Sequence, residues 1–360
     1  MIVAHTQPQL SQAWLDKYRH QRPHFACVLG FTATCRIPNI SAAGLTPADR
    51  ELTALADGEF LSRGIQPSYR YPLPPLIAGA SPAIITKAIL SALNIPITIL
   101  NSGLPQAPGF DCVDLGGQPA DCLSTGQAMP IELVQHLWQQ GLAWGAKLIA
   151  AAPYIVIGEC VVGGTTTALA LLTGLGINAE GKVNSSHPQC NHQQKKLLVE
   201  QGLRQISTRA NTWEIVAAIG DPMQIVAAAM AVAASEQGGV LLAGGTQMLA
   251  VYALISKLAP DCYLERIAVG TTGWVTKDRS GDAVGLAVNI SPAIFFSAQV
   301  EFANSGYEQL QVYDRGFVKE GVGAGGAAIA AGLYQGWGSN DVLQATEKLL
   351  DDLLVNTLSG

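Results

Sequence analysis

The strongest constraint on the fold is a repeated order of elements, in which a short apolar run leads into a glycine-rich turn and then a helical pattern. The run at 154–157 is followed by such a turn and a helical pattern over 165–175, and the run at 240–243 leads into a similar turn. Buried strands that alternate with helices form parallel sheets covered on both faces. The sequence therefore predicts an α/β fold, with a doubly wound, mostly parallel sheet flanked by helices.

Capping signals set further boundaries. Thr46 precedes Pro47 and lies three residues before Asp49, an arrangement typical of a helix start. The helix that begins there is expected to end at Gly64. Further strands are expected at 25–31, 95–100 and 267–270, and further helices at 10–21, 82–94, 130–147, 192–205, 212–236 and 246–258, with a wholly helical tail over 321–354.

The segment 66–75 is the most proline-dense stretch of the chain, and a helix cannot run through it. We interpret this segment as a linker. Strands alternate with helices over 76–310, whereas the two chain ends lack this alternation. We therefore expect an α/β domain at 76–310 and a smaller, mainly helical domain built from 1–75 and 311–360.

Composition excludes several classes of protein. Hydrophobic residues make up 49% of the 360 residues and charged residues only 13%, which excludes intrinsic disorder. The net charge of −6, with no basic stripe, argues against nucleic-acid binding. The most apolar stretch, 225–234, is half the roughly 20 residues that a membrane-spanning helix needs. Residues 1–17 have no signal-peptide pattern, so we expect a cytoplasmic protein.

The seven cysteines are scattered and form no C-x-x-C pair, which is typical of reduced thiols. His187, Cys190 and His192 are three metal-ligand types within six residues. A zinc site would need a fourth donor, and the sequence offers none nearby. We therefore expect no metal site and interpret this segment as a loop.

The turn after the run at 154–157 contains Gly163 and Gly164 followed by Thr165, Thr166 and Thr167. Glycines let the backbone approach a ligand, and free N–H groups at a helix start attract anions. Threonine hydroxyls add donors for phosphate oxygens. The turn is therefore a candidate phosphate site; the alternative is a tight turn in which the threonines cap the helix.

Two further glycine-rich segments lie before helices. Gly244 and Gly245 follow a strand and either hold a second ligand group or pack against a neighbouring turn. Residues 321–326 match G-x-G-x-x-G, but no strand precedes them and no second strand with an acid follows, so a dinucleotide fingerprint is excluded.

Glu320 directly precedes this third segment. A partly desolvated glutamate has a raised pKa and suits a general base, although an ordinary surface glutamate is the alternative. Lys195 or its neighbour Lys196 could supply a cation for the same phosphate, unless both are simply solvated. The sequence does not choose between the two lysines.

These motifs occur together in one order, which resembles the nicotinate-nucleotide:dimethylbenzimidazole phosphoribosyltransferases of cobamide lower-ligand activation. The resemblance is strongest to the shorter archaeal and cyanobacterial branch and covers about 76–340, with a similar stretch at 39–44. The matching motifs are Gly158-Glu159-Cys160, Gly163 to Thr167, Gly220-Asp221-Pro222, Ala243 to Thr246 and Glu320 to Ala324.

The resemblance implies a reaction in which nicotinate mononucleotide and dimethylbenzimidazole give the α-ribotide of that base and free nicotinate, in a homodimer and without a cofactor. It implies that Glu320 is the catalytic base, that Glu159 meets the ribose and that Val318 lies in the base pocket. The remaining phosphoribosyl-binding residues implied are Gly163, Gly164, Thr165, Thr166, Thr167, Lys195, Gly244, Gly245, Gly321 and Gly323.

The chain departs from the better-known bacterial enzymes at two positions. Gly164 replaces an asparagine, and Lys319 replaces a glycine, a change expected to lower the pKa of Glu320. The acceptor could be another azole or a purine, because the base-pocket residues of the N-terminal quarter are not evident. A non-catalytic, nucleotide-binding paralogue that regulates or scaffolds cobamide assembly is the alternative function.

Overall fold

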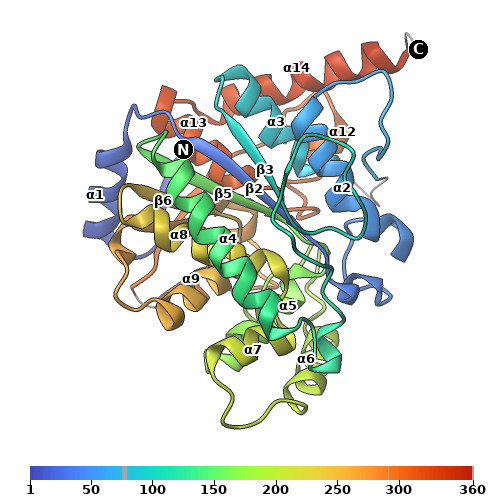
Figure 1. The fold of residues 1–360 in the computed structure, drawn as a ribbon. Coiled ribbons are helices and arrows are strands. Elements are labelled where there is room, and N and C mark those ends of the chain that lie inside the picture. Colours follow the sequence, from blue (N-terminus) through green and yellow to red (C-terminus); the bar gives the residue numbers. More distant parts are fainter. Residues whose placement is uncertain (75–78, 291, 359–360) are drawn as a thin grey trace.

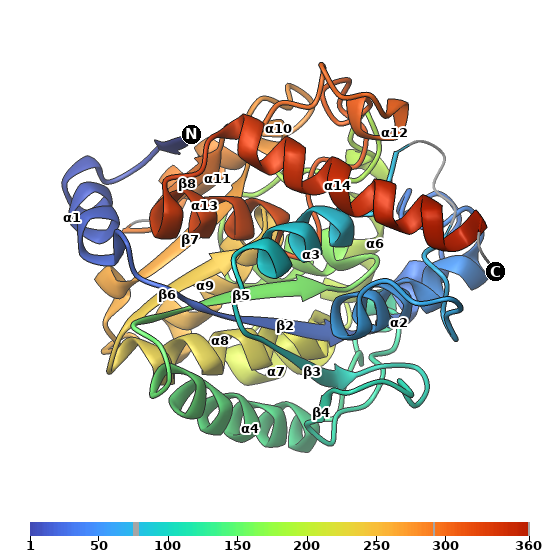
Figure 2. The same ribbon diagram turned by 90° about the horizontal axis from the view of Figure 1, so that it is seen from above.

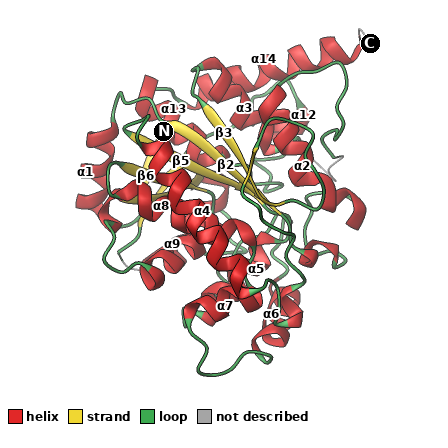
Figure 3. Ribbon diagram, viewed as in Figure 1, coloured by secondary structure: helices red, strands yellow, loops and turns green. Residues whose placement is uncertain are grey.

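A single eight-stranded sheet forms the centre of the computed structural model, which describes residues 1–74, 79–290 and 292–358 (Figures 1 and 3). All neighbouring strands are parallel except the first pair, β1 and β8. The expected doubly wound, mostly parallel α/β fold is therefore confirmed. The strand order is β1 (Ile2–Ala4), β8 (Ile294–Ala298), β7 (Ile267–Thr272), β6 (Gly239–Ala243), β5 (Tyr154–Cys160), β2 (His24–Gly30), β3 (Ile97–Gly103) and β4 (Val113–Asp114).

Helices cover both faces of the sheet (Figure 2). In β2, Phe25, Cys27 and Leu29 face one layer, while Ala26 and Val28 face the other, because successive side chains of a strand point to opposite faces. One layer contains α4 (Ile131–Ile149), α5 (Gly164–Gly174), α7 (Thr212–Ile219), α8 (Pro222–Ser235), α9 (Thr246–Leu258) and α11 (Ala283–Asn289), and the other contains α1 (Pro8–Tyr18), α2 (Pro47–Arg63), α3 (Pro82–Ala92), α13 (Ala324–Gln335) and α14 (Ser339–Leu358).

The two ends of the chain meet in the second layer. Helix α3 packs against both α13 and α14, which come from the far end of the chain. However, β1 and β2 of the first 75 residues belong to the same sheet as the strands of 76–310. The division into two domains stays a proposal, and any boundary between them crosses this shared sheet.

Helix boundaries follow the capping chemistry. Thr46 and Asp49 form a reciprocal capping box at the start of α2, and Gly64 ends that helix with a φ of 65°. The single helix expected over 212–236 is wrong: it is two helices, α7 and α8. In a helix interior, proline removes a backbone hydrogen bond and clashes with the preceding turn, but it suits the first turn. Asp221 therefore caps a new helix whose first residue is Pro222.

The sequence pattern does not predict strand β8, although its sequence Ile294-Phe295-Phe296-Ser297-Ala298 is fully buried. It also does not predict the very short β1 and β4, because two or three residues show no period. The expected helical tail contains no strand among its described residues, and it forms two helices, since Gly336, at φ 69°, ends α13 before α14 begins. The remaining helices are α6 (His192–Leu203), α10 (Gly273–Thr276) and α12 (Glu308–Gln311), with 3₁₀ turns at Ala33–Arg36, Leu123–Thr125 and Leu264–Arg266.

The strand order reverses beside β2. From β2 the chain moves outward to β3 and β4, and then returns to place β5 on the opposite side of β2. In open α/β sheets, ligands bind where the carboxyl ends of two strands diverge at such a switch point. The topology therefore points to the ends of β2 and β5. Across the described part of the chain, no helix is both long and apolar enough to span a membrane.

Candidate active site

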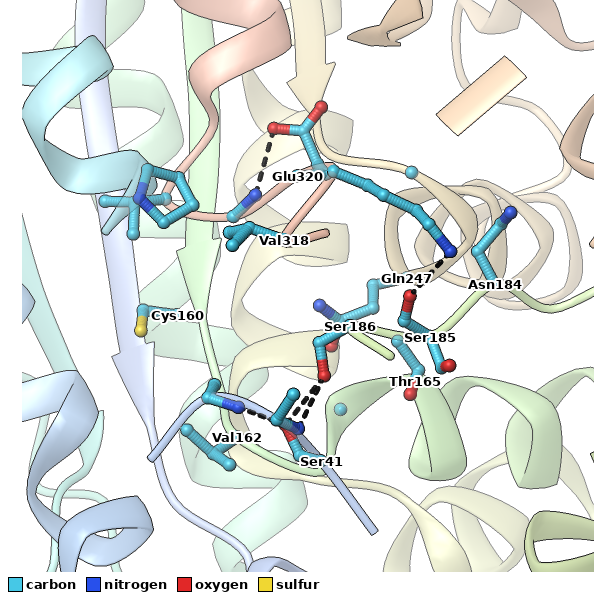
Figure 4. Close-up of a pocket in the computed structure, with 18 of the residues that line it drawn as sticks. Ser41, Cys160, Val162, Thr165, Asn184, Ser185, Ser186, Gln247, Val318 and Glu320 are labelled. Carbon is cyan, nitrogen blue, oxygen red and sulfur yellow. Dashed lines mark hydrogen bonds between the residues drawn. The ribbon is translucent and has the colours of Figure 1, made fainter. Parts of the chain in front are cut away.

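A cavity opens at this switch point. Its walls come from the loops after β2, β5 and β6, and from the segment 317–322 before α13. Figure 4 shows Cys160 on one side, Thr165 and Ser185 on the other, and Glu320 above the space between them. Of the residues expected from sequence, the cavity brings together Glu159, Gly163, Gly164, Thr165, Gly245, Val318, Glu320 and Gly321.

The turn after β5 presents the start of α5 to the cavity. Gly163 has a φ of 86°, a conformation that favours glycine, and its carbonyl accepts the N–H groups of Thr166 and Thr167. Thr165 lines the cavity, whereas Thr166 and Thr167 lie behind it. The Thr167 hydroxyl instead donates to Asp221 at 2.5 Å, so it supports the turn from below.

Gln247 fills the space beside Gly164. A Cβ atom on residue 164 would lie 1.6 Å from Gln247 Oε1, so only glycine fits there. Gln247 also donates to Glu159 Oε1 at 2.6 Å. The sequence pattern does not predict a role for this α9 residue. Its side chain nevertheless places an amide beside Gly164.

Glu159 is buried, and its second carboxylate oxygen accepts the N–H of Val161 at 3.2 Å. Burial, together with the carboxylates of Asp221 and Glu320, raises the pKa of Glu159 to about 8. Near neutral pH the side chain therefore keeps a proton, and it can both donate and accept hydrogen bonds with a ligand.

The loop 184–187 forms the wall opposite Cys160. The sequence pattern singled out only His187 of this loop, and as a metal-ligand type rather than as a cavity residue. Neither Asn184 Oδ1 nor Ser185 Oγ has a hydrogen-bond partner among the described residues, although both atoms are buried. Buried polar atoms without a partner cost free energy, and such groups in a cavity are typical of a ligand site. The sequence carries no local pattern for this role, because only the tertiary fold brings this loop to the start of α5.

The two adjacent lysines have different environments. Lys195 is fully buried, donates to the Asn184 carbonyl at 2.6 Å, and supports the loop 184–187 from behind rather than lining the cavity. Burial lowers the pKa of Lys195 to about 8. Lys196 points outward and pairs with Glu180 at 2.5 Å. Of the two, only Lys195 therefore contacts the cavity wall, through the Asn184 carbonyl.

Four donors hold the Glu320 carboxylate. Thr271 Oγ1 and Thr272 N donate to Oε2 at 2.8 and 2.9 Å, while the N–H groups of Gly321 and Gly325 donate to Oε1 at 3.2 and 3.1 Å. Burial nevertheless outweighs these bonds and raises the pKa of Glu320 above its usual value. The result is a fixed carboxylate with increased affinity for a proton.

The expected effect of Lys319 on Glu320 is wrong. The Lys319 ammonium turns away from Glu320 and pairs with Asp278 at 2.6 Å, while also donating to the His187 carbonyl at 2.9 Å. Lys319 has a φ of 58°, in the left-handed region that favours glycine.

The remaining glycines serve packing. Gly323 has a φ of 70° and lies where a Cβ would be 3.0 Å from the Cα of Gly158. The N–H of Gly244 donates to the Gly270 carbonyl, and this residue does not line the cavity. Gly323 and Gly244 therefore let α13 and the strand ends approach closely.

The side chains of the His187–His192 segment bind protein atoms. His187 and His192 contact the carbonyls of Asn39 and Ser280, at 3.0 and 2.5 Å, and the Cys190 thiol donates to Asp278. These contacts tie the loop to its neighbours.

The N-terminal quarter also contributes to the cavity. Residues 41–43 follow β2, while Thr53 and Asp57 belong to α2 and Ser81 precedes α3. The sequence did not assign these positions, because a helix such as α2 has no pattern that marks a cavity-facing carboxylate.

Comparisons with known proteins agree with this fold. A family model described as a phosphoribosyltransferase matches residues 92–268. The nicotinate-nucleotide-dimethylbenzimidazole phosphoribosyltransferase of Thermus thermophilus superposes with a TM-score of 0.61 and 17% identity, over 96% of this chain and 92% of that one. A structure of CobT from the same organism gives 0.59 and 16%, over 95% and 90%.

Other relatives match nearly the whole chain in sequence. A UPF0284 protein of Synechocystis sp. is 57% identical over 356 residues, covering 97% of this chain and 96% of the relative. A UPF0284 protein of Microcystis aeruginosa is 56% identical, with 97% and 98% covered. The resemblance that the motifs indicated is thus confirmed by a phosphoribosyltransferase family model and by the fold, and the chain belongs to the UPF0284 family.

Proposed function

We propose that this chain moves the 5-phosphoribosyl group of nicotinate mononucleotide to a benzimidazole-like or purine base, giving the α-ribotide and nicotinate for cobamide lower-ligand activation. One observation carries the proposal: a fixed carboxylate of raised pKa, Glu320, shares a cavity with the helix start at Gly163 to Thr165. A base and an anion site within one cavity suit transfer of a phosphorylated sugar.

In the proposed reaction, the N–H group of the incoming ring gives its proton to a carboxylate oxygen of Glu320. The ring's other nitrogen, which carries a free in-plane lone pair, forms a bond to the anomeric carbon. The bond from that carbon to the pyridinium nitrogen breaks, and its electron pair neutralises the ring, so nicotinate leaves without needing a proton. General-base help of this kind typically contributes about 10²–10⁴-fold to the rate.

The cavity offers a place for each part of the nucleotide. The start of α5 and the unpartnered Ser185 hydroxyl suit the phosphate, with Lys195 behind them. Glu159 suits the ribose hydroxyls, because it can both donate and accept.

The test is a chromatographic assay of nicotinate release from nicotinate mononucleotide, with purified protein and a panel of azoles and purines. Release that requires an added base, together with formation of its ribotide, supports the proposal. If the nucleotide binds but no base yields product, the proposed transferase activity is wrong, and the protein is instead a non-catalytic, nucleotide-binding paralogue. We also propose that the protein is cytoplasmic and forms a homodimer. Light scattering of the purified protein measures its molar mass and so tests the homodimer.

A further inference from the structure

One end of the cavity contains a buried carboxyl group that the proposed proton transfer and phosphate binding leave unused. Asp57 of α2 lines the cavity and is 3% exposed. Its Oδ1 accepts the Ser81 hydroxyl at 2.7 Å, and its Oδ2 accepts the Cys160 thiol at 3.3 Å. This end of the cavity is therefore polar at its base, where three elements, α2, α3 and β5, meet.

This end adjoins the proposed catalytic base. Pro82 follows Ser81 and packs against the Glu320 loop, since a Cβ on Gly321 would lie 3.2 Å from Pro82 Cγ. The start of α5 and the loop 184–187 lie on the other side of the cavity from Cys160 (Figure 4). With the phosphate at that far side, the base that Glu320 deprotonates belongs between Glu320 and Asp57.

The chemistry of Asp57 favours one class of base. Each carboxylate oxygen has two lone pairs, and each accepts one protein donor here. A ring that placed methyl groups against Asp57 would bury the remaining lone pairs without a donor, which costs free energy. A ring with an amino or hydroxyl group would supply the donor. Sites built around such a bond reject analogues that lack it.

We propose that Asp57, positioned by Ser81, determines acceptor specificity by selecting an azole or purine that bears an amino or hydroxyl donor. This inference rests on the proposed function and narrows its acceptor. Adenine or a hydroxybenzimidazole would donate a hydrogen bond to the Asp57 carboxylate, whereas the methyl-bearing edge of dimethylbenzimidazole has no group that could do so.

The experiment compares matched bases: 5-hydroxybenzimidazole against benzimidazole and 5,6-dimethylbenzimidazole, and adenine against purine. For the unaltered protein, we expect kcat/KM to be at least about tenfold higher for each base with a donor. In Asp57→Asn the ratio falls below about threefold, and in Asp57→Leu dimethylbenzimidazole becomes the better substrate. The exposed change Asp16→Asn leaves the ratios as they were.

Equal or reversed preference in the unaltered protein, or an unchanged ratio in Asp57→Asn, overturns the inference. Calorimetric binding of the same bases to protein saturated with nicotinate mononucleotide is measured in parallel. If no base releases nicotinate, the proposed reaction fails, but binding that favours donor-bearing bases and depends on Asp57 still supports the specificity. Binding without that preference contradicts it.

Discussion

Lys319 and Asp278 form a buried ion pair, 2.6 Å from Nζ to Oδ2, that joins the loop before α13 to the loop after α10. Both side chains are nearly inaccessible, at 3% and 5% exposure. Asn184 donates to the same Asp278 oxygen at 2.9 Å. The pair thus holds together the residue next to Glu320 and the loop proposed to meet the phosphate.

Removing one member of this pair is expected to destabilise the fold strongly. Lys319→Met leaves the Asp278 charge buried without its partner, which typically costs about 3–5 kcal/mol. Asp278→Asn leaves the Lys319 ammonium buried without its partner in the same way. The double variant should lose less unfolding free energy than the sum of the losses in the two single variants. Urea denaturation of the unaltered protein, the two single variants and the double variant measures the four free energies of unfolding.

Lys277, which precedes Asp278, provides the control for the comparison of the single and double variants. Its side chain is 57% exposed and lies 3.8 Å from Glu301, so Lys277→Met should change stability by less than about 1 kcal/mol. Strict additivity of Lys319→Met and Asp278→Asn would show that the two residues do not act as a pair.

Glu320→Gln is expected to lower nicotinate release at least about 100-fold, because the amide keeps the shape of the side chain but cannot accept the proton. Affinity for nicotinate mononucleotide, measured by calorimetry, should stay within about threefold, since catalysis and ground-state binding separate in such a variant. Glu308→Gln, on an 82% exposed side chain, is the matched control. Undiminished turnover in Glu320→Gln would remove this residue from the reaction.

Gly164→Ala is expected to expel the Gln247 side chain and break its bond to Glu159, since the added Cβ would overlap Gln247 Oε1. Overpacking of this kind costs about 1–3 kcal/mol. Adding Gln247→Ala should restore room, so Gly164→Ala in that background costs less than it does alone. Thermal melting of the four proteins measures the difference.

The control for this substitution is Gly306→Ala. Its nearest neighbour to an added Cβ is Glu347 Oε1 at 3.9 Å, so the methyl group meets no clash. If Gly164→Ala lowered the melting temperature equally with and without Gln247, the steric relationship would be refuted.

Asp221→Asn is expected to change how stability depends on pH. Burial raises the pKa of Asp221 from its ordinary value of 3.8 to about 6. As pH rises between these values, the unfolded chain loses this proton while the folded chain keeps it, so the group lowers stability. Asparagine caps helices equally well and carries no charge.

The variant should therefore gain stability over the unaltered protein as pH increases from about 4 to 6, reaching about 1–3 kcal/mol at pH 7. Urea denaturation at several pH values measures this gain. Asp282→Asn is the control, because Asp282 also caps a helix but its side chain is 52% exposed. A constant difference between Asp221→Asn and the unaltered protein across this range would contradict the assignment.

The local elements of this fold follow from short-range chemistry. The capping box at Thr46, the buried strands at 154–157 and 240–243, and the glycine-rich turns all depend on residues within one or two turns of each other. Periodicity and capping report such interactions directly. The strands β1 and β4 are too short to show a repeating pattern of apolar and polar residues. They can be recognised only from their pairing with β8 and β3 in the folded sheet.

By itself, the sequence determined the strand–turn–helix alternation, the parallel sheet and the candidacy of Glu320, whereas Glu159 became a candidate through the family resemblance. Tertiary structure alone decided that Lys195 faces inward and Lys196 outward, that Gln247 occupies the space beside Gly164, and that Lys319 pairs with Asp278 instead of acting on Glu320. The physical reason is that these contacts join residues far apart along the chain or depend on how whole elements pack, which no local pattern encodes.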